Sequence, residues 1–193
     1  RAPAGAFTPA PGVEAVLLAR AGTQAPGAEV ALLLQLNARP SLGELIELYE
    51  LGLKGLADDL PNYAHAVLAP AAGLPALSAK PYVRWLGEYR PEFKYRAQDP
   101  AAPGNGRAFI YPIDGDRPPY RAGLAALGVA VERYDGRGRF YYARVDEARL
   151  AGVAALPWVR WIERDSGEAL LQAGEAFEPD DSRELVCAFD SGR

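Results

Sequence analysis

The chain has 193 residues, a length that suits one large domain or two small ones. Its 25 acidic and 21 basic residues give a net charge of −4, which excludes a protein that coats nucleic acid with a basic face. No apolar run approaches the length of a membrane span. Methionine is absent, which indicates that a signal peptide or other leading segment has been removed. We therefore expect a secreted protein, extracellular or periplasmic, with a residue usage typical of a GC-rich bacterial genome.

The chain contains a single cysteine, Cys187, and a single histidine, His65. These counts exclude an intrachain disulfide and a Cys/His zinc cluster. His65 falls in an expected strand without a supporting motif, so it is interpreted as an ordinary strand residue and not as part of a Ser-His-Asp site. Asp58 and Asp59 could bind a cation, but a solvated turn is the favoured interpretation. We expect no enzymatic activity from this chain alone, and no metal or cofactor.

The first part of the chain consists of a leader and a first unit. Residues 1–28 are rich in Ala, Pro and Gly and are expected to form a mostly extended leader with one strand. The first unit spans residues 29–99. Its expected elements are a buried strand over 30–36, a helix from Ser41, strands over 56–60 and 63–69, a helix over 71–80 and a strand over 82–89.

The first of these helices carries clear end signals. Ser41 and Glu44 form a capping-box pattern, and Gly52 and Gly55 mark the end of the helix. Helical spacing predicts an apolar face that packs against the sheet. The members of that face are Leu42, Leu45, Ile46, Tyr49 and Leu53. The acidic residues Glu44, Glu47 and Glu50 are expected to form a solvent-facing stripe.

A second unit follows a Pro/Gly-rich linker over residues 100–106. The second unit spans residues 107–165, and residues 166–193 form a further linker and a final strand. Asp135-Gly136 predicts a hairpin, and Asp146 is the expected cap of a helix. The expected elements are strands over 108–113, 129–134, 140–145 and 158–163, with helices over 119–127 and 147–156.

The two units form an internal repeat. Residues 80–86 match residues 156–162 at an offset of 76, whereas the first strands align at an offset of 77. Each unit then reads β-α-β-β-α-β, which predicts an α+β protein of two tandem ferredoxin-like plaits, each an antiparallel four-stranded sheet with two helices on one face. Trp85 and Trp161 occupy equivalent positions and are expected to be buried in the two cores.

The end of each unit carries a short motif with a family resemblance. Leu156-Pro157-Trp158-Val159-Arg160-Trp161-Ile162-Glu163 resembles the closing segment of the prodomains of subtilisin-like serine proteases, and Val83-Arg84-Trp85-Leu86 is a weaker copy. The resemblance implies the same βαββαβ plan. It also implies the role of an intramolecular chaperone and temporary inhibitor of a cognate subtilisin-like protease domain, which would be the partner of this chain. No nucleic-acid or membrane partner is expected.

The tail strengthens this resemblance. Residues 184–192 are similar to the strand that carries the catalytic aspartate of subtilisin-like proteases, and Asp190 matches that aspartate, although Arg193 departs from the family pattern. The histidine and serine blocks are not in the chain. The resemblance implies that part of residues 165–182 lies in the protease cleft by adding a strand to a sheet edge, with residues 169–171 or 176–177 as the alternatives. The acidic residues of the tail form a solvated linker or face a basic protease surface.

Aromatic residues gather in the second hairpin. Strand alternation places Phe140 and Tyr142 on one face of the sheet and Tyr141 on the other. The face away from the helices is where such prodomains meet their protease, and packing between the two units is the alternative. The same plait binds RNA in RRM domains, but no RNP-type motif is present and the net charge has the wrong sign. A stand-alone extracellular interaction module is the other functional hypothesis.

Overall fold

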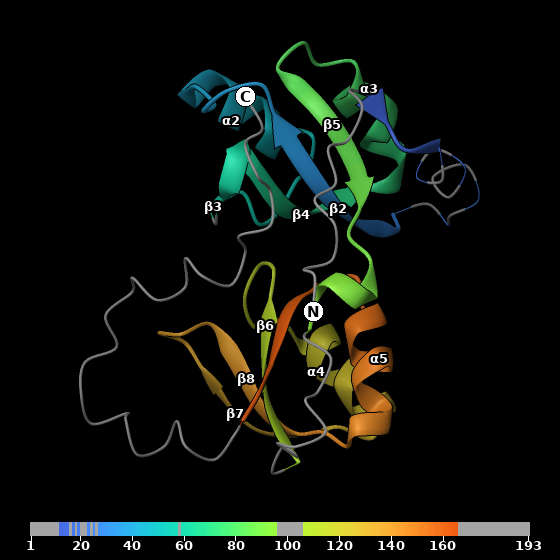
Figure 1. Ribbon diagram of the computed structural model, residues 1–193, viewed down its shortest axis with the longest axis vertical. Coiled ribbons are helices and arrows are strands. Elements are labelled where there is room, and N and C mark those ends of the chain that lie inside the picture. Colours follow the sequence, from blue (N-terminus) through green and yellow to red (C-terminus); the bar gives the residue numbers. More distant parts are fainter. Residues whose placement is uncertain are drawn as a thin grey trace, which may run out of the picture. The chain divides into compact units, whose positions relative to one another are not determined.

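The computed structural model describes residues 12–15, 17, 19, 23, 25, 27–57, 59–95 and 106–165. The chain divides into two compact units at Glu88/Tyr89 (Figure 1). This boundary lies before residue 99, the end of the first unit in the sequence analysis, because Lys94 and Tyr95 pair with the last strand of the second unit. Both units contain helices and a mainly antiparallel sheet, so the α+β class is confirmed.

The first unit contains a five-stranded sheet in the order β1-β5-β2-β4-β3. The short β1 is parallel to β5, and the other pairs are antiparallel. The elements of this unit are β1 (Gly12–Val13), β2 (Glu29–Leu36), α2 (Leu42–Glu50), β3 (Asp59–Leu60), β4 (Ala64–Pro70), α3 (Leu74–Ser78) and β5 (Val83–Glu88), with short 3-10 turns at Pro61–Tyr63 and Ala71–Gly73.

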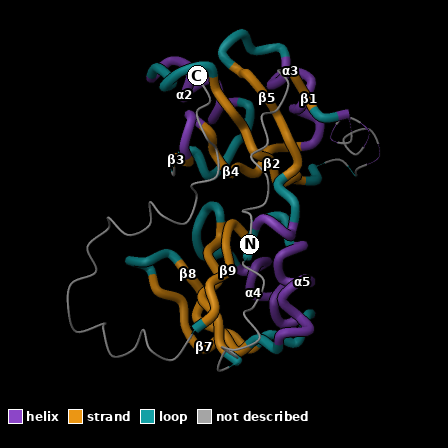
Figure 2. The backbone as a smooth tube through the Cα atoms, viewed as in Figure 1, coloured by secondary structure: helices purple, strands orange, loops and turns teal. Residues whose placement is uncertain are grey.

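The second unit contains a four-stranded antiparallel sheet in the order β7-β8-β6-β9. In Figures 1 and 2, α4 and α5 lie together beside this sheet. The elements are a 3-10 turn at Pro91–Phe93, β6 (Arg107–Pro112), α4 (Pro118–Ala126), β7 (Ala130–Asp135), β8 (Phe140–Arg144), α5 (Glu147–Ala155) and β9 (Val159–Arg164).

The strand registers show that the two units repeat at a constant offset. Leu34 pairs with Leu86 in the first unit, and Ile110 pairs with Ile162 in the second, which is 76 residues later for both partners. The pairing register also shifts at equivalent places, between Gln35 and Leu36 in the first unit and between Tyr111 and Pro112 in the second. The offset of 77 for the first strand was therefore wrong. Hydrophobic runs such as 31–36 align almost equally well after a one-residue slip, whereas strand pairing distinguishes the two alignments.

In each unit a short segment from earlier in the chain pairs with the outer edge of the last strand. Val13 of β1 pairs in parallel with Leu86, and Tyr95 pairs in parallel with Ile162, the equivalent residue of β9. In both units this partner comes from the segment that precedes the first long strand. The outer edges of β5 and β9 are thus partly covered by backbone hydrogen bonds.

The first helix of each unit ends in the same way. Gly52 has φ +82° and Gly128 has φ +70°, a conformation that disfavours residues with a Cβ. Each glycine N–H donates to the carbonyl three residues earlier, and the N–H of the next residue donates to the carbonyl five residues earlier. This pair of backbone hydrogen bonds is a Schellman cap, so the predicted helix end at Gly52 is confirmed.

The predicted core face of α2 was wrong in part. The capping box is present, with the Ser41 N–H 2.7 Å from a Glu44 carboxylate oxygen. However, Leu48 is the buried residue of the helix, whereas Leu42, Ile46 and Tyr49 are 75%, 48% and 53% exposed. The helix has apolar residues on two faces, and periodicity alone does not reveal which one meets the sheet.

The core of the second unit is built around Trp158. Its ring is buried and stacks on Tyr120 with centroids 4.3 Å apart. Trp85 and Trp161 do occupy equivalent positions, paired with Gln35 and Tyr111, and Trp85 is buried. Trp161 is partly exposed, so its assignment to the core was wrong. It shares a sheet face with Tyr111, which points away from the helices.

None of the helices in the described ranges is long and apolar enough to cross a membrane.

Candidate functional site

The open face of the second sheet, away from α4 and α5, carries a cluster of aromatic side chains. Along β6 the buried Ala108 and Ile110 alternate with Phe109 and Tyr111, which are partly exposed. Directly opposed residues of paired strands share a face. The cluster, called the aromatic face below, consists of Phe109, Tyr111, Phe140, Tyr142 and Trp161.

Ring contacts hold the aromatic face together. The Phe109 ring lies 5.1 Å from those of Phe140 and Tyr142, and the Tyr111 ring lies 5.5 Å from that of Phe140. Edge-to-face and tilted arrangements at these separations are favourable for aromatic pairs. Phe109, Tyr111, Phe140 and Tyr142 therefore form a connected, preformed group of rings.

The predicted division of the β8 aromatics between the two faces is confirmed. Tyr141 pairs with Ile110 and is fully buried on the helix side, whereas Tyr142 pairs with Phe109 on the open face. The Tyr141 hydroxyl donates to Asp116 Oδ1 at 2.7 Å. Burial and this hydrogen bond raise the pKa of Tyr141, so the phenol remains protonated at neutral pH.

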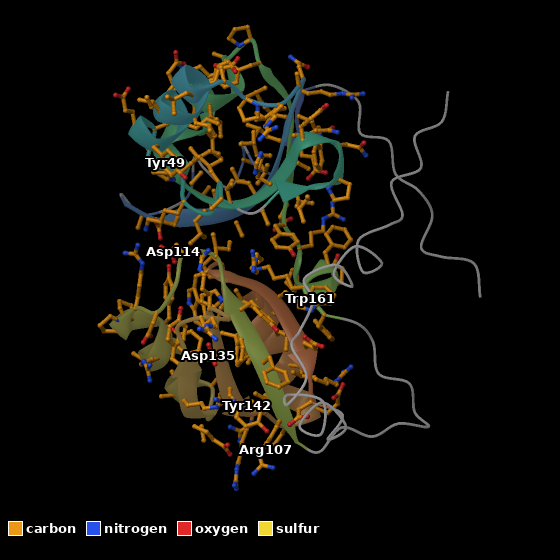
Figure 3. The ribbon with its side chains drawn as sticks, turned by 90° about the vertical axis from the view of Figure 1, so that its left-hand side faces the viewer. Tyr49, Arg107, Asp114, Asp135, Tyr142 and Trp161 are labelled. Carbon is orange, nitrogen blue, oxygen red and sulfur yellow. The ribbon has the colours of Figure 1, made fainter. Side chains whose placement is uncertain are left out.

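Charged side chains surround the aromatic face. Glu132 of β7 lies between Arg144, at 2.7 Å, and Arg107, at 3.4 Å, and the hydrogen bond from Arg144 lowers the pKa of Glu132. The Arg133 guanidinium lies 5.4 Å from the centre of the Tyr142 ring. Figure 3 shows Arg107 and Tyr142 close together on this unit. The surface thus has an apolar centre and a rim with both signs of charge.

The hydroxyl of Tyr111 connects the aromatic face to β9. It donates to the Glu163 carboxylate at 3.3 Å. Burial and the charge of Glu163 raise the pKa of Tyr111 to about 12. The hydroxyl is consequently a hydrogen-bond donor at any physiological pH.

The first unit lacks this cluster. The positions 76 residues earlier hold the aliphatic, polar or small residues Leu33, Gln35, Ala64 and Ala66, together with Trp85. The Trp85 ring lies directly over Gly87, where an added Cβ would come within 2.0 Å of it. Because the same fold forms without the other four aromatics, the plan of the unit does not require them.

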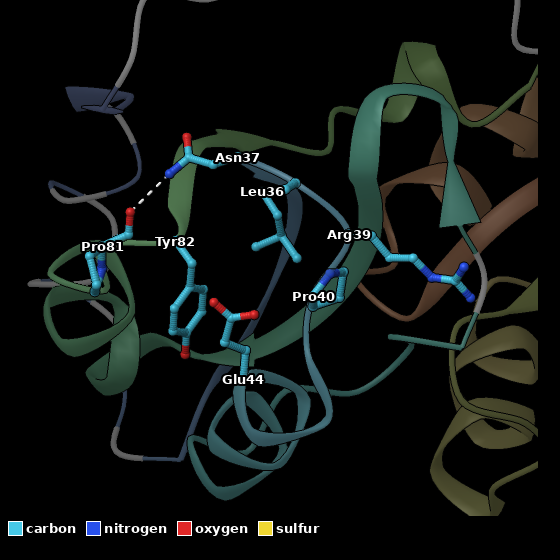
Figure 4. Close-up of a pocket in the computed structure, with 8 residues that line it drawn as sticks. Leu36, Asn37, Arg39, Pro40, Glu44, Pro81 and Tyr82 are labelled. Carbon is cyan, nitrogen blue, oxygen red and sulfur yellow. Dashed lines mark hydrogen bonds between the residues drawn. The ribbon is translucent and has the colours of Figure 1, made fainter.

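A hollow of about 320 Å³ lies at one end of the first unit (Figure 4). Its walls include Pro40, Glu44 and Tyr82, and the Asn37 side chain donates to the Pro81 carbonyl at 2.9 Å beside it. In the second unit the positions of Glu44 and Tyr82 hold Tyr120 and Trp158, the stacked pair of the core. The Glu44 carboxylate is engaged in the cap of α2. We therefore assign no binding role to this hollow.

The other residues considered in the sequence analysis do not form a site in the described ranges. His65 is a buried residue of β4. No group of three or more acidic, cysteine or histidine residues in the described part of the chain could hold a metal ion. Asp58, Cys187, the catalytic-type Asp190 and the tail over 166–182 lie outside the described residues.

Sequence reasoning missed two partners of the aromatic face, Phe109 and Tyr111. Their signal was present, since every second residue of the strand 107–112 faces the same way. The sequence predicted a strand over 108–113, but its alternating residues were not assigned to the two faces of the sheet.

The fold and this surface together define an α+β protein of two repeat units, one of which presents an aromatic sheet face. Comparison with protein-family models, with curated proteins and with solved structures found no match to this chain.

Proposed function

We propose that the chain is the propeptide region of a secreted subtilisin-like serine protease, and that the second unit binds the protease domain through the aromatic face. The observation that carries this proposal is the aromatic face itself. It is present on the second sheet and replaced by mostly small or aliphatic residues in the first.

The topology is compatible with this role. In each unit the four main strands follow the spatial order fourth, first, third, second, with the intervening helices crossing over the sheet. This is the order of a ferredoxin-like plait, the plan that the resemblance of residues 156–163 to subtilisin prodomains implies. We infer that both units are such plaits and that one sheet face of the second unit is left for a partner.

The chemistry of the surface suits a protein partner. Tyr, Trp and Phe are enriched at the centre of protein interfaces, where they bury much area with few rotatable bonds. Arg107, Arg133 and Glu132 at the rim supply the polar border that such interfaces have. A nucleic-acid partner would need a basic surface, which the mixed rim does not offer.

The tail would provide inhibition. β9 ends at Arg164, and the chain continues into residues 166–182, which would add to the substrate cleft as an extended segment. Asp190 is the one residue of this chain that matches a catalytic position of the family. The chain would therefore bind and inhibit a protease and would not itself cleave peptides. Its expected setting is extracellular or periplasmic.

The proposal is tested by titrating the full chain into mature subtilisin while cleavage of a small peptide substrate is measured. We expect competitive inhibition, because the tail occupies the substrate cleft. Phe140→Ser removes a partly exposed ring at the centre of the aromatic face and should weaken inhibition at least tenfold, the effect of losing a central interface aromatic of about 1.4 kcal/mol or more.

The matched control is Phe93→Ser. Phe93 is also an exposed phenylalanine of the second unit, but it lies in the 3-10 turn outside the sheet. It should leave inhibition unchanged. Equal effects of both variants would mean that the aromatic face is not the binding surface. No inhibition of subtilisin, or of a protease domain encoded directly after this chain, would leave the interaction module as the better hypothesis.

A further inference from the structure

The chain is held at two points where it leaves the second sheet. Asp165 directly follows the last residue of β9 and is fully buried. Its carboxylate accepts a hydrogen bond of 2.6 Å from the Tyr142 hydroxyl, and its backbone N–H donates to the Arg107 carbonyl at 3.0 Å. The second bond extends the pairing of β6 and β9 by one residue. Both the side chain and the backbone of Asp165 are thus fixed.

Tyr142 belongs to both the aromatic face and this exit point. Its ring lies 5.1 Å from the ring of Phe109 and beneath the guanidinium of Arg133. Its hydroxyl reaches Asp165, and this hydrogen bond raises the pKa of Tyr142, so that the phenol keeps the proton it donates. Tyr142 is itself buried, and its ring contact with Phe109 links the aromatic face to the residue that holds Asp165.

The first unit has no such pair. The residues 76 positions earlier are Ala66 for Tyr142 and Tyr89 for Asp165. Alanine has no hydroxyl, and Tyr89 belongs to the second unit, where its hydroxyl donates to the Arg160 carbonyl at 2.7 Å. The repeat thus folds without the pair, which occurs only in the unit that precedes the acidic tail. A requirement of the fold would be expected in both units.

We propose that the hydrogen bond between Tyr142 and Asp165 positions the tail for the protease cleft. This inference rests on the proposed function. An extended segment binds more tightly when its first residue is already held in the bound direction, because less conformational freedom is lost on binding. The pair fixes Asp165, the last described residue before the tail, beside the aromatic face. Tyr142 and Asp165 are therefore positioning residues.

The test combines one hydroxyl deletion with a change of tail. Tyr142→Phe removes only the hydroxyl. Tyr111→Phe is the matched control, since Tyr111 is also an aromatic-face tyrosine that donates to a carboxylate, that of Glu163. Each variant is made in two backgrounds of equal length. One has the native tail, and in the other a Gly-Ser sequence replaces residues 166–182. Calorimetry then measures the Kd for a subtilisin whose catalytic serine is replaced by alanine.

We expect Tyr142→Phe to raise the Kd several-fold, up to about tenfold, with the native tail, because the bond exists before binding and its loss leaves the start of the tail to be ordered on binding. With the Gly-Ser tail the increase should be less than about twofold. Tyr111→Phe should have equal effects in both backgrounds. Hydrogen exchange at the Asp165 amide should accelerate in Tyr142→Phe but not in Tyr111→Phe. A role in docking alone would give equal changes with both tails and would overturn the inference, as would unchanged exchange at Asp165.

Failure of the proposed function has a different signature. In that case the unmodified chain does not bind subtilisin at all, and the positioning role falls with it. If only the positioning role is wrong, the unmodified chain binds and the two tails respond alike to Tyr142→Phe.

Discussion

Two tryptophans three residues apart should differ sharply in their contribution to stability. Trp158 is 6% exposed, stacks on Tyr120 at 4.3 Å and meets the Tyr141 ring edge-on at 6.1 Å. Trp158→Ala removes a buried ring and should cost about 3–5 kcal/mol, of which each aromatic contact accounts for roughly 0.5–1.5 kcal/mol. A unit of this size is stable by only about 4–12 kcal/mol, so this loss is a large fraction of its stability.

The assay is urea unfolding of the full chain followed by circular dichroism. With a slope of about 1–2 kcal/mol per M, Trp158→Ala should lower the urea midpoint of the second unit by roughly 1.5–5 M. Trp161→Ala is the control. Because Trp161 lies partly exposed on the open face, its removal should cost about 1 kcal/mol or less. An equal loss of unfolding free energy from the two substitutions would refute the assignment of Trp158 to the core and of Trp161 to the open face.

Three further predictions concern stability. Leu48→Ala should cost about 2–5 kcal/mol, whereas Ile46→Ala on the exposed side of α2 should cost less than about 1 kcal/mol; a comparable loss of thermal stability in both would contradict the orientation of the helix. The hydrogen bond from Arg121 lowers the pKa of Asp116 in the folded state, so its contribution to stability is present at neutral pH and disappears as the pH falls through that lowered pKa. Asp116→Asn should flatten this part of the acid-unfolding curve, and an unchanged curve would count against the pair. Asp135 accepts from two backbone N–H groups in the turn after β7, so Asp135→Ala should lower the Tm and Asp135→Asn should largely preserve it, whereas equal Tm values for the two variants would exclude this role.

Local signals in the sequence were sufficient for the order of elements. The capping box at Ser41 and Glu44, the glycine at position 52 and the hairpin at Asp135-Gly136 all depend on contacts within a few residues, and the structure contains each of them. The internal repeat was also detectable, since both units conserve the sequence around the last strand. Local chemistry therefore predicted the β-α-β-β-α-β order well.

Which face of a helix or strand is buried depends on contacts between segments far apart in the chain, and the spacing of residues does not reveal these contacts. α2 has apolar residues on two faces, and only packing against the sheet selects the face with Leu48 over the face with Leu42 and Ile46. In the same way, Trp158 and Trp161 both follow a helix and a proline, but strand pairing with Tyr111 places Trp161 outside the core. The hydrogen bond between Tyr142 and Asp165 joins residues 23 positions apart and has no local pattern.

The most direct test of the central claim is hydroxyl-radical footprinting of the full chain with and without a subtilisin whose catalytic serine is replaced by alanine. Oxidation rates report the solvent exposure of individual aromatic side chains. We predict that Tyr111, Phe140 and Trp161 become protected on binding, whereas the exposed aromatics Tyr49 and Phe93 keep their rates. Binding without protection of the aromatic face, or protection of Tyr49 or Phe93 in its place, would contradict the proposal that this surface binds the protease.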